Sequence, residues 1–175
     1  MRPLILKMDI SLDGFVGRPG GDPAWLLANY DDELTTYMVD FIGRAETHVM
    51  GRQTYEEMAR HWPTSTEPFA KPMNETPKAV FSTTLQEATW PETTIYRDIE
   101  TGIAELKAQD GGPIVAYGGA RFVQELTRLG LIDEYRLNLH PVALHDGYKA
   151  FGAKLKLKLV EARAFPSGTV ALTYA

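Results

Sequence analysis

The chain has 175 residues, and with 44% hydrophobic and 23% charged residues its composition is typical of a globular protein, which excludes a disordered or fibrous chain. Its length predicts a single domain over residues 1–175, and its net charge of -5 gives no overall attraction to nucleic acid or to an anionic membrane. The chain contains no run of about 18 apolar residues, so no membrane span is predicted. The absence of cysteine excludes disulfides and thiolate metal sites and is typical of a cytoplasmic protein.

Strands and helices are predicted in alternation over the first three quarters of the chain. A short apolar run, interrupted by Lys7 and Asp9, predicts a buried strand that ends in a turn at residues 11–14. Asp31 begins an acidic stretch that favours the first turn of a helix. The predicted strands cover residues 3–10, 47–50, 78–81, 94–96 and 113–117. The predicted helices cover residues 31–42, 52–59, 99–109 and 120–129.

The last part of the chain predicts strands alone. They cover residues 134–144, 155–164 and 168–174, whereas the proline- and threonine-rich residues 62–77 predict a loop. Alternating strands and helices followed by a β-rich end predict an α/β fold. Its central sheet is expected to be mostly parallel, with helices on both faces and antiparallel strands at one C-terminal edge.

Two predicted strand ends carry glycines where a helix begins. In open α/β sheets such places bind anions, because a helix N-terminus presents unpaired N–H groups and the positive end of the helix dipole. The alternative is that glycine serves close packing alone, but two such turns in one chain favour the phosphates of a dinucleotide. The residues concerned are Gly51, Arg52, Gln53 and Thr54 at the first turn and Gly118, Gly119, Ala120 and Arg121 at the second.

A third strand end is polar rather than rich in glycine. Ser82, Thr83 and Thr84 carry hydroxyl groups that either bind a phosphate or cap a turn, and the sequence leaves both roles open. Neither the Rossmann pattern G-x-G-x-x-G nor the P-loop pattern G-x-x-x-x-G-K-[ST] occurs. Two histidines at i, i+4 spacing beside an acid are also absent, so no metal site is predicted.

Three segments, in this order and with these separations, resemble the dihydrofolate reductase superfamily. They are Ser-Leu-Asp-Gly-Phe-Val-Gly over residues 11–17, Met-Gly-Arg-Gln-Thr-Tyr-Glu over 50–56 and Tyr-Gly-Gly-Ala-Arg over 117–121. The chain is most similar to the reductase domain of the bifunctional riboflavin-biosynthesis deaminase-reductase, a branch that also ends in strands like residues 157–163 and 166–170.

This resemblance implies a three-layer fold of the dihydrofolate reductase type, a homodimer and an NADPH-dependent oxidoreductase. The implied reaction is hydride transfer to a small heterocyclic, imine or carbonyl substrate, as in dihydrofolate reductase or 5-amino-6-(5-phosphoribosylamino)uracil reductase. A nucleotide-binding module without turnover is the alternative hypothesis.

The resemblance also implies where NADPH binds. Arg52 and Gln53 are expected near its 2′-phosphate, and Ser82 and Thr83 near the same phosphate or its ribose. The pyrophosphate is expected at the two helix N-termini, which the dipole argument predicts independently. The implied cofactor residues are Val16 and Gly17 beside the nicotinamide, with Gly51, Arg52, Gln53, Thr54, Ser82, Thr83, Gly118, Gly119, Ala120 and Arg121 around the rest of the molecule.

The sequence leaves the proton donor and the substrate open. The resemblance implies an acid on the first helix that binds the substrate ring, and Asp32 or Glu33 stands at about that place; the alternative is an acidic helix start in solvent. Asp13 either acts near the substrate or bonds to its own turn, and an ordered water is a further candidate. Residues 145–151 depart from the glycine-rich turn and Leu-Phe pair of the riboflavin branch.

Aromatic and imidazole side chains give weaker indications. Trp25 and Trp62 are predicted to flank the mouth of the site, where they either stack on a flat ring or anchor a loop. His48 and His140 lie in apolar strands and are predicted to be packed, hydrogen-bonded side chains rather than catalysts.

Overall fold

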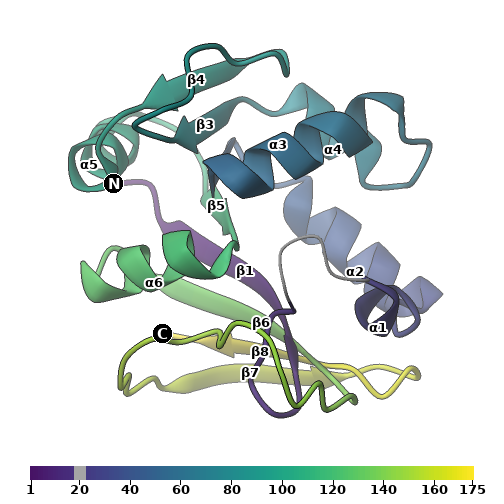
Figure 1. Ribbon diagram of the computed structural model, residues 1–175. Coiled ribbons are helices and arrows are strands. Elements are labelled where there is room, and N and C mark those ends of the chain that lie inside the picture. The colour runs from purple at the N-terminus through teal and green to yellow at the C-terminus, as the bar shows by residue number, and fades with distance from the viewer. Residues whose placement is uncertain (18–22) are drawn as a thin grey trace.

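The structure is a computed structural model that describes residues 1–17 and 23–175. Its strands form an eight-stranded sheet in the order β4-β3-β2-β5-β1-β6-β8-β7, with helices on both faces (Figure 1). The strands are β1 (Leu4–Ser11), β2 (Thr47–Gly51), β3 (Lys78–Phe81), β4 (Thr93–Tyr96), β5 (Ile114–Tyr117), β6 (Glu134–His140), β7 (Leu159–Ala164) and β8 (Val170–Tyr174). The helices are α1 (Ala24–Leu27), α2 (Asp32–Ile42), α3 (Arg52–His61), α4 (Ala70–Glu75), α5 (Ile99–Ala108) and α6 (Ala120–Arg128), with a 3₁₀ turn η1 at Trp62–Thr64.

The sheet is parallel from β4 to β6 and antiparallel beyond β6. β1 lies near its middle and pairs in parallel with β5 on one side and β6 on the other. β8 runs antiparallel to both β6 and β7, so β7 forms the outer edge. The predicted α/β fold, with a mostly parallel sheet and an antiparallel C-terminal edge, is therefore confirmed.

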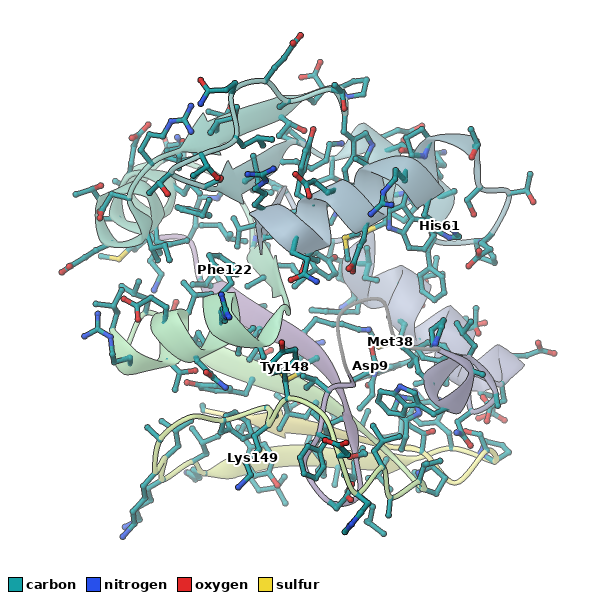
Figure 2. All side chains as sticks on the ribbon, in the orientation of Figure 1. Asp9, Met38, His61, Phe122, Tyr148 and Lys149 are labelled. Carbon is teal, nitrogen blue, oxygen red and sulfur yellow. The ribbon has the colours of Figure 1, made fainter. Side chains whose placement is uncertain are left out.

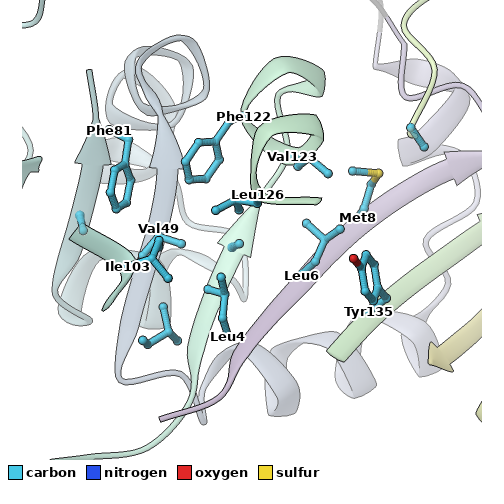
Figure 3. Packing of buried hydrophobic residues seen from close by; sticks show 14 of the residues in the cluster. Leu4, Leu6, Met8, Val49, Phe81, Ile103, Phe122, Val123, Leu126 and Tyr135 are labelled. Carbon is cyan, nitrogen blue, oxygen red and sulfur yellow. The ribbon is translucent and has the colours of Figure 1, made fainter. Parts of the chain in front are cut away.

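The two faces of β1 belong to two hydrophobic cores. Its even-numbered side chains, from Leu4 to Met8, pack with residues of α5 and α6 (Figure 3). Ile5 belongs to the second core, which contains residues of α2, α3 and α4. Side chains alternate between the faces of a strand, so Lys7 and Asp9 lie on the same face as Ile5. Two charged groups are thereby placed on a largely buried face of the central strand.

Residues 62–77 are not the loop that their composition predicts. They contain η1 and α4, and Pro72 is the third residue of α4, where a helix has no hydrogen-bond partner for the N–H that proline lacks. The ammonium of Lys78 donates to three carbonyls at the C-terminal end of α4, at 2.8 to 3.2 Å. Because this cap comes from the following strand, local composition does not reveal the helix.

All three of the final strands are shorter than predicted, and β8 begins at Val170 rather than at residue 168. β6 ends at His140 instead of residue 144, because Pro141 follows and has no N–H for a strand ladder. β7 begins at Leu159 rather than at residue 155. Within residues 1–17 and 23–175, no helix has the length and apolar character needed to cross a membrane.

Candidate functional site

A cavity of about 800 Å³ lies at the C-terminal ends of β1, β2 and β5 and is bordered by α3, α6 and α1. Small-molecule sites typically have volumes of about 300–1,000 Å³. Ser82 and Thr83 are not among the residues that line it. The other predicted cofactor residues all line it, and these are Val16, Gly17, Gly51, Arg52, Gln53, Thr54, Gly118, Gly119, Ala120 and Arg121.

Two helices begin at this cavity without a side-chain cap. Gly51 and Gly119 are the N-cap residues of α3 and α6, and neither helix has an acid in its first turn. By contrast, α2 and α5 are capped by Asp31 and Asp98, whose carboxylates accept a bond from the helix backbone. The first turns of α3 and α6 therefore keep N–H groups and a positive dipole end available for an anion. This arrangement fits the pyrophosphate of the implied cofactor.

The two glycine turns also lie close to each other. A Cβ atom on Gly51 would lie 3.1 Å from the Cβ of Phe122, and one on Gly119 would lie 3.0 Å from Oγ1 of Thr54. The Thr54 hydroxyl donates to the carbonyl of Gly118 at 3.0 Å. The glycines thus have a packing role, and the same close approach brings both helix N-termini to one cavity.

Arg52 lies beside the polar turn that follows β3. Its Nη1 donates to Oγ1 of Thr84 at 2.7 Å, and its Nε donates to Glu56 at 2.6 Å. The Ser82 hydroxyl accepts bonds from two backbone N–H groups of its own turn, and Arg97 donates to the Ser82 carbonyl at 2.8 Å. Ser82 therefore caps this turn, while Thr84 is the hydroxyl next to Arg52.

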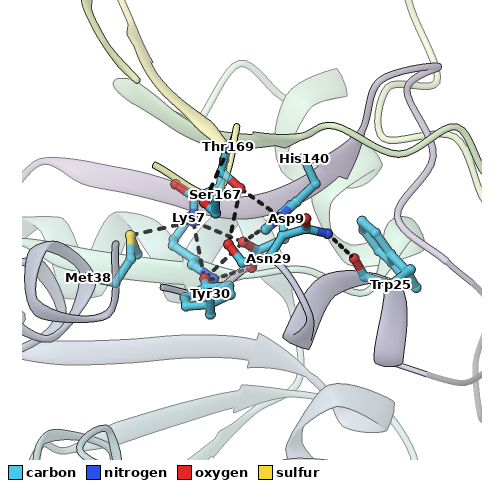
Figure 4. A network of polar contacts seen from close by, with 10 residues as sticks. Lys7, Asp9, Trp25, Asn29, Tyr30, Met38, His140, Ser167 and Thr169 are labelled. Carbon is cyan, nitrogen blue, oxygen red and sulfur yellow. Dashed lines mark hydrogen bonds and ion pairs between the residues drawn. The ribbon is translucent and has the colours of Figure 1, made fainter. Parts of the chain in front are cut away.

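The other end of the cavity, called the β1 end here, is lined by Lys7 and Asp9 of β1. These two side chains belong to a largely buried polar network (Figure 4). Lys7 and Asp9 form an ion pair through Oδ2 of Asp9, and their side chains are only 13% and 12% exposed. Oδ1 of Asp9 accepts bonds from Tyr30 at 2.9 Å, Asn138 at 2.9 Å and His140 at 3.0 Å. Lys7 also donates to the Tyr30 hydroxyl at 3.2 Å. Every side chain in this network has at least one partner from a different segment of the chain.

The groups in this network stabilise one another's charge states. Burial alone would lower the pKa of Lys7, but the carboxylate of Asp9 outweighs burial and raises that pKa above its ordinary value. Burial alone would raise the pKa of Asp9, but the Lys7 ammonium and the bond from His140 lower it below its ordinary value. Burial also raises the pKa of Tyr30. Near neutral pH, Lys7 is therefore a cation, Asp9 an anion and Tyr30 a neutral phenol.

His48 and Tyr117 form a second buried pair, and Tyr117 also lines the cavity. Nε2 of His48 lies 3.2 Å from the carbonyl of Pro72, and Nδ1 lies 3.2 Å from the Tyr117 hydroxyl. Burial lowers the pKa of His48 to about 4, so the ring is neutral. Because the carbonyl requires a donor, Nε2 carries the proton and Nδ1 accepts from Tyr117. His48 and His140 are both buried and hydrogen-bonded, as predicted.

Two aromatic side chains line the same end of the cavity as Lys7. Trp25, on α1, packs edge-to-face with His140, at 5.6 Å between ring centroids. Tyr148 is 43% exposed, and its backbone bonds to Val16 and Gly17 at 2.9 Å each. Figure 2 shows Tyr148 and Asp9 in the central part of the molecule. Trp62, which was predicted to flank the mouth, instead packs against the α2, α3 and α4 core.

The predicted acids lie outside the lining of this cavity. Asp32 and Glu33 are exposed at the start of α2, and Glu33 lies 4.0 Å from Arg163. Asp13 is exposed and accepts bonds from the backbone N–H groups of Leu144 and His145 at 3.0 and 2.7 Å. Hydrogen bonds from Ser11 and from these backbone groups lower the pKa of Asp13 to about 2. In this structure Asp13 holds two loops together.

Lys7, Asp9 and Tyr148 were not predicted as site residues, and Thr84 was predicted only as part of the polar strand end at residues 82–84. The signal for the first two is present in the sequence, because two charged residues two positions apart interrupt an apolar strand. The contacts of the other two depend on loops that only the fold places. Within the described residues, no group of three or more His, Asp or Glu side chains has an arrangement that could hold a metal ion.

Comparisons with known proteins found one matching family and two similar proteins of Bacillus subtilis. The model of the RibD C-terminal domain family matches residues 2–171. The uncharacterized protein YyaP of Bacillus subtilis is 32% identical, over 99% of this chain and 94% of its own length. YwjB, an uncharacterized protein of the same organism, is 28% identical over 90% of each chain.

Two solved structures share the fold. A Shewanella sp. PV-4 protein assigned to riboflavin biosynthesis superposes with a TM-score of 0.80 at 23% identity, covering 98% of this chain and 97% of its own. The diaminohydroxyphosphoribosylaminopyrimidine deaminase/5-amino-6-(5-phosphoribosylamino)uracil reductase of Thermotoga maritima superposes with a TM-score of 0.70 at 16% identity. That match covers 99% of this chain but 56% of the Thermotoga protein, so the likeness is to part of a longer chain.

Proposed function

The chain belongs to the RibD C-terminal domain family, and from this membership we propose that it is an NADPH-dependent reductase of a small heterocyclic, imine or carbonyl compound. The observation that carries the proposal is the pair of uncapped helix N-termini, of α3 and α6, at one cavity. When bound, NADPH supplies the hydride that reduces the acceptor carbon, and a proton completes the reduced bond.

Different residues of this chain bind different parts of the cofactor. The first turns of α3 and α6 bind the pyrophosphate through backbone N–H groups. Arg52, held beside Thr84, binds the 2′-phosphate, because a guanidinium and a hydroxyl together donate to its oxygens. Val16 and Gly17 border the nicotinamide at the β1 end of the cavity.

The acceptor lies beside Lys7 at the β1 end of the cavity. The raised pKa of Lys7 makes it a hydrogen-bond donor that polarises the acceptor rather than an acid that gives up its proton. Asp9 stays ionised and holds Lys7 in place. A water molecule therefore supplies the proton, and Asp13, Asp32 and Glu33 have no part in this step because they lie outside the cavity lining.

A thermal-unfolding scan with NADPH or NADH at equal concentrations tests the cofactor. At about 100 times the dissociation constant, binding to the native state contributes about 2.7 kcal/mol, which raises the unfolding midpoint by roughly 5–11 °C for a chain of this size. We expect this shift with NADPH and a much smaller one with NADH. No shift with either cofactor would contradict the proposal.

A nucleotide-binding module without turnover is the second candidate. The observation in its favour is that Asp13, Asp32 and Glu33 all lie outside the cavity lining. NADPH oxidation in the presence of pterin, aminouracil or cyclic imine acceptors separates the two functions. Oxidation with any of them excludes the module, whereas tight NADPH binding without oxidation across the series supports it.

A further inference from the structure

The charges of the described side chains at the β1 end of the cavity cancel. Among the described residues that line the cavity, Lys7, Arg52 and Arg121 are the cations. Arg52 and Arg121 belong to the first turns of α3 and α6, which the proposed cofactor occupies. Lys7 is therefore the cation at the β1 end, and the carboxylate of Asp9 neutralises it. A phosphate placed there would meet no net positive charge from the described side chains.

The hydrogen-bonding capacity of this ion pair is largely used within the protein. Oδ1 of Asp9 accepts three bonds and Oδ2 accepts one from Lys7, so the carboxylate has little capacity left for a ligand. An ammonium has three N–H groups, and two of those of Lys7 are used, one in the bond to Asp9 and one in the bond to Tyr30. Among the described residues no third partner for the Lys7 ammonium is found, so one N–H remains for a ligand. A single donor suits one carbonyl oxygen or imine nitrogen rather than the several oxygens of a phosphate.

Aromatic side chains supply the remaining contact surface at this end. A Cβ on Gly17 would lie 3.5 Å from Nε1 of Trp25, so the indole lies directly against the Gly17 backbone. The backbone of Tyr148 is fixed to the same segment by its bonds to Val16 and Gly17. Both rings are on backbone that the fold holds in place, and aromatic faces are suited to a flat ring.

No helix N-terminus suited to a phosphate lies among the described residues of this end. α1 begins there, but it has only four residues. The acceptor named for the Thermotoga protein, 5-amino-6-(5-phosphoribosylamino)uracil, carries a phosphate. From these observations, and resting on the proposed function, we infer that the acceptor of this chain is a flat, uncharged lactam or cyclic imine without a phosphate group, bound by Lys7 and by the rings of Trp25 and Tyr148.

The experiment is calorimetric titration of the protein saturated with NADP⁺, which fills the cofactor end without turnover. The probes are 7,8-dihydropterin, 5-amino-6-ribosylaminouracil and the 5-phosphate of the latter, so that the last two differ only in the phosphate. We expect the unphosphorylated aminouracil to bind about 10-fold or more tightly than its phosphate, because the phosphate would be desolvated without a cation. Equal or tighter binding of the phosphate overturns the inference, and so does failure of all three probes to bind.

Variants at Tyr148 test the effect of ring stacking and the effect of local charge on probe binding separately. Tyr148→Ser is expected to weaken both unphosphorylated probes by about 10-fold through loss of stacking, with NADP⁺ affinity unchanged. Tyr148→Arg, compared with Tyr148→Ser, is expected to strengthen the phosphorylated probe alone. Leu27→Ser is the matched control, because Leu27 is exposed on α1 and does not line the cavity. If neither Tyr148 variant changes the binding of any probe, the inference is wrong.

NADP⁺ affinity is measured before the probes are added. A protein that does not bind NADP⁺ contradicts the proposed function, and the inference fails with it. A protein that binds NADP⁺ and prefers the phosphorylated probe retains the proposed function and contradicts the inference alone. The two failures are therefore distinguished by the first titration.

Discussion

Lys7 and Asp9 show what single residues in this sequence reveal and what they do not. Their spacing within an apolar strand indicates that two charges share one face of β1. Their partners, Tyr30, Asn138 and His140, come from 21 to 131 residues away along the chain. No local pattern predicts which of these side chains meet. The sequence thus indicates an unusual position for two charges, while the network that fixes their charge states follows from the fold.

Arg52 carries the first prediction at this scale. Arg52→Ala is expected to weaken NADPH binding roughly 10- to 100-fold, because a hydrogen bond to a charged group contributes about 1.5–3 kcal/mol. NADH lacks the 2′-phosphate, so its affinity is expected to change little. Fluorescence titration with both cofactors measures this difference.

Arg60→Ala is the matched control for Arg52→Ala. Arg60 lies on the same helix, donates to the carbonyl of Glu56 and does not line the cavity. It is expected to leave the affinity for both cofactors unchanged. Equal losses of NADPH and NADH affinity in Arg52→Ala would place the 2′-phosphate elsewhere.

At the scale of elements, the sequence predicts both glycine turns but not their contact. Glycine at the start of α3 and α6 is visible in the sequence, and it predicts either an anion site or close packing. The fold shows that Gly51 lies against Phe122 of α6, so one helix restricts the other. α4 shows the converse, because its cap comes from Lys78 on β3 and leaves no trace in the composition of residues 62–77.

Gly51→Ala tests the contact between α3 and α6. The added Cβ would lie 3.1 Å from the Cβ of Phe122, which is close to the backbone and has little freedom to move. We expect a loss of about 1–3 kcal/mol in the free energy of unfolding, together with weaker NADPH binding. Urea unfolding with and without NADPH measures both effects.

Gly118→Ala is the control for this contact. Its added Cβ would lie 3.4 Å from Met8 and 3.5 Å from Val123, which are ordinary contact distances. Its free energy of unfolding is expected to fall by less than about 1 kcal/mol. If Gly51→Ala is as stable as Gly118→Ala, the two helices have room to separate and the packing argument fails.

His48 links β2 to α4 and gives stability a pH dependence. Burial lowers its pKa from 6.5 to about 4 in the folded protein. Between these values the unfolded chain binds a proton that the folded chain does not, so the free energy of unfolding falls as pH falls from 6.5 to 4. The loss attributable to His48 is about 3 kcal/mol, and it is complete below about pH 4.

His48→Gln isolates this effect, because glutamine keeps an amide donor and an acceptor but does not titrate in this range. Urea unfolding at several pH values between 4 and 7 is expected to give the variant a shallower pH dependence than the native protein. Carboxylates contribute equally to both curves and cancel in the difference. Parallel curves would contradict a neutral, buried His48.

At the scale of the whole molecule, the strand order places β7 at one edge of the sheet. Periodicity predicts the parallel part and the antiparallel end of the sheet, because helices separate most of the strands before residue 134, β3 and β4 excepted, and strands alone follow it. It does not predict that β7 is exposed along its whole length, since a strand of that pattern normally buries one face. Among the described residues, β7 pairs with β8 on one side only.

The outer edge of β7 leads us to propose a homodimer in which two copies of this chain meet at that strand. Leu159 is 51% and Val160 is 62% exposed, and an edge strand presents N–H and C=O groups that can pair with another strand. Sedimentation equilibrium is expected to give about twice the 19.5 kDa chain mass for the native protein and the chain mass for Val160→Lys, because a charged edge opposes pairing. Leu12→Lys is the control, since Leu12 is 64% exposed in a turn far along the chain from β7, and it is expected to leave the dimer intact. A native protein that sediments as a monomer at micromolar concentration would contradict the dimer, and a Val160→Lys variant that remains a dimer would place the interface on another surface.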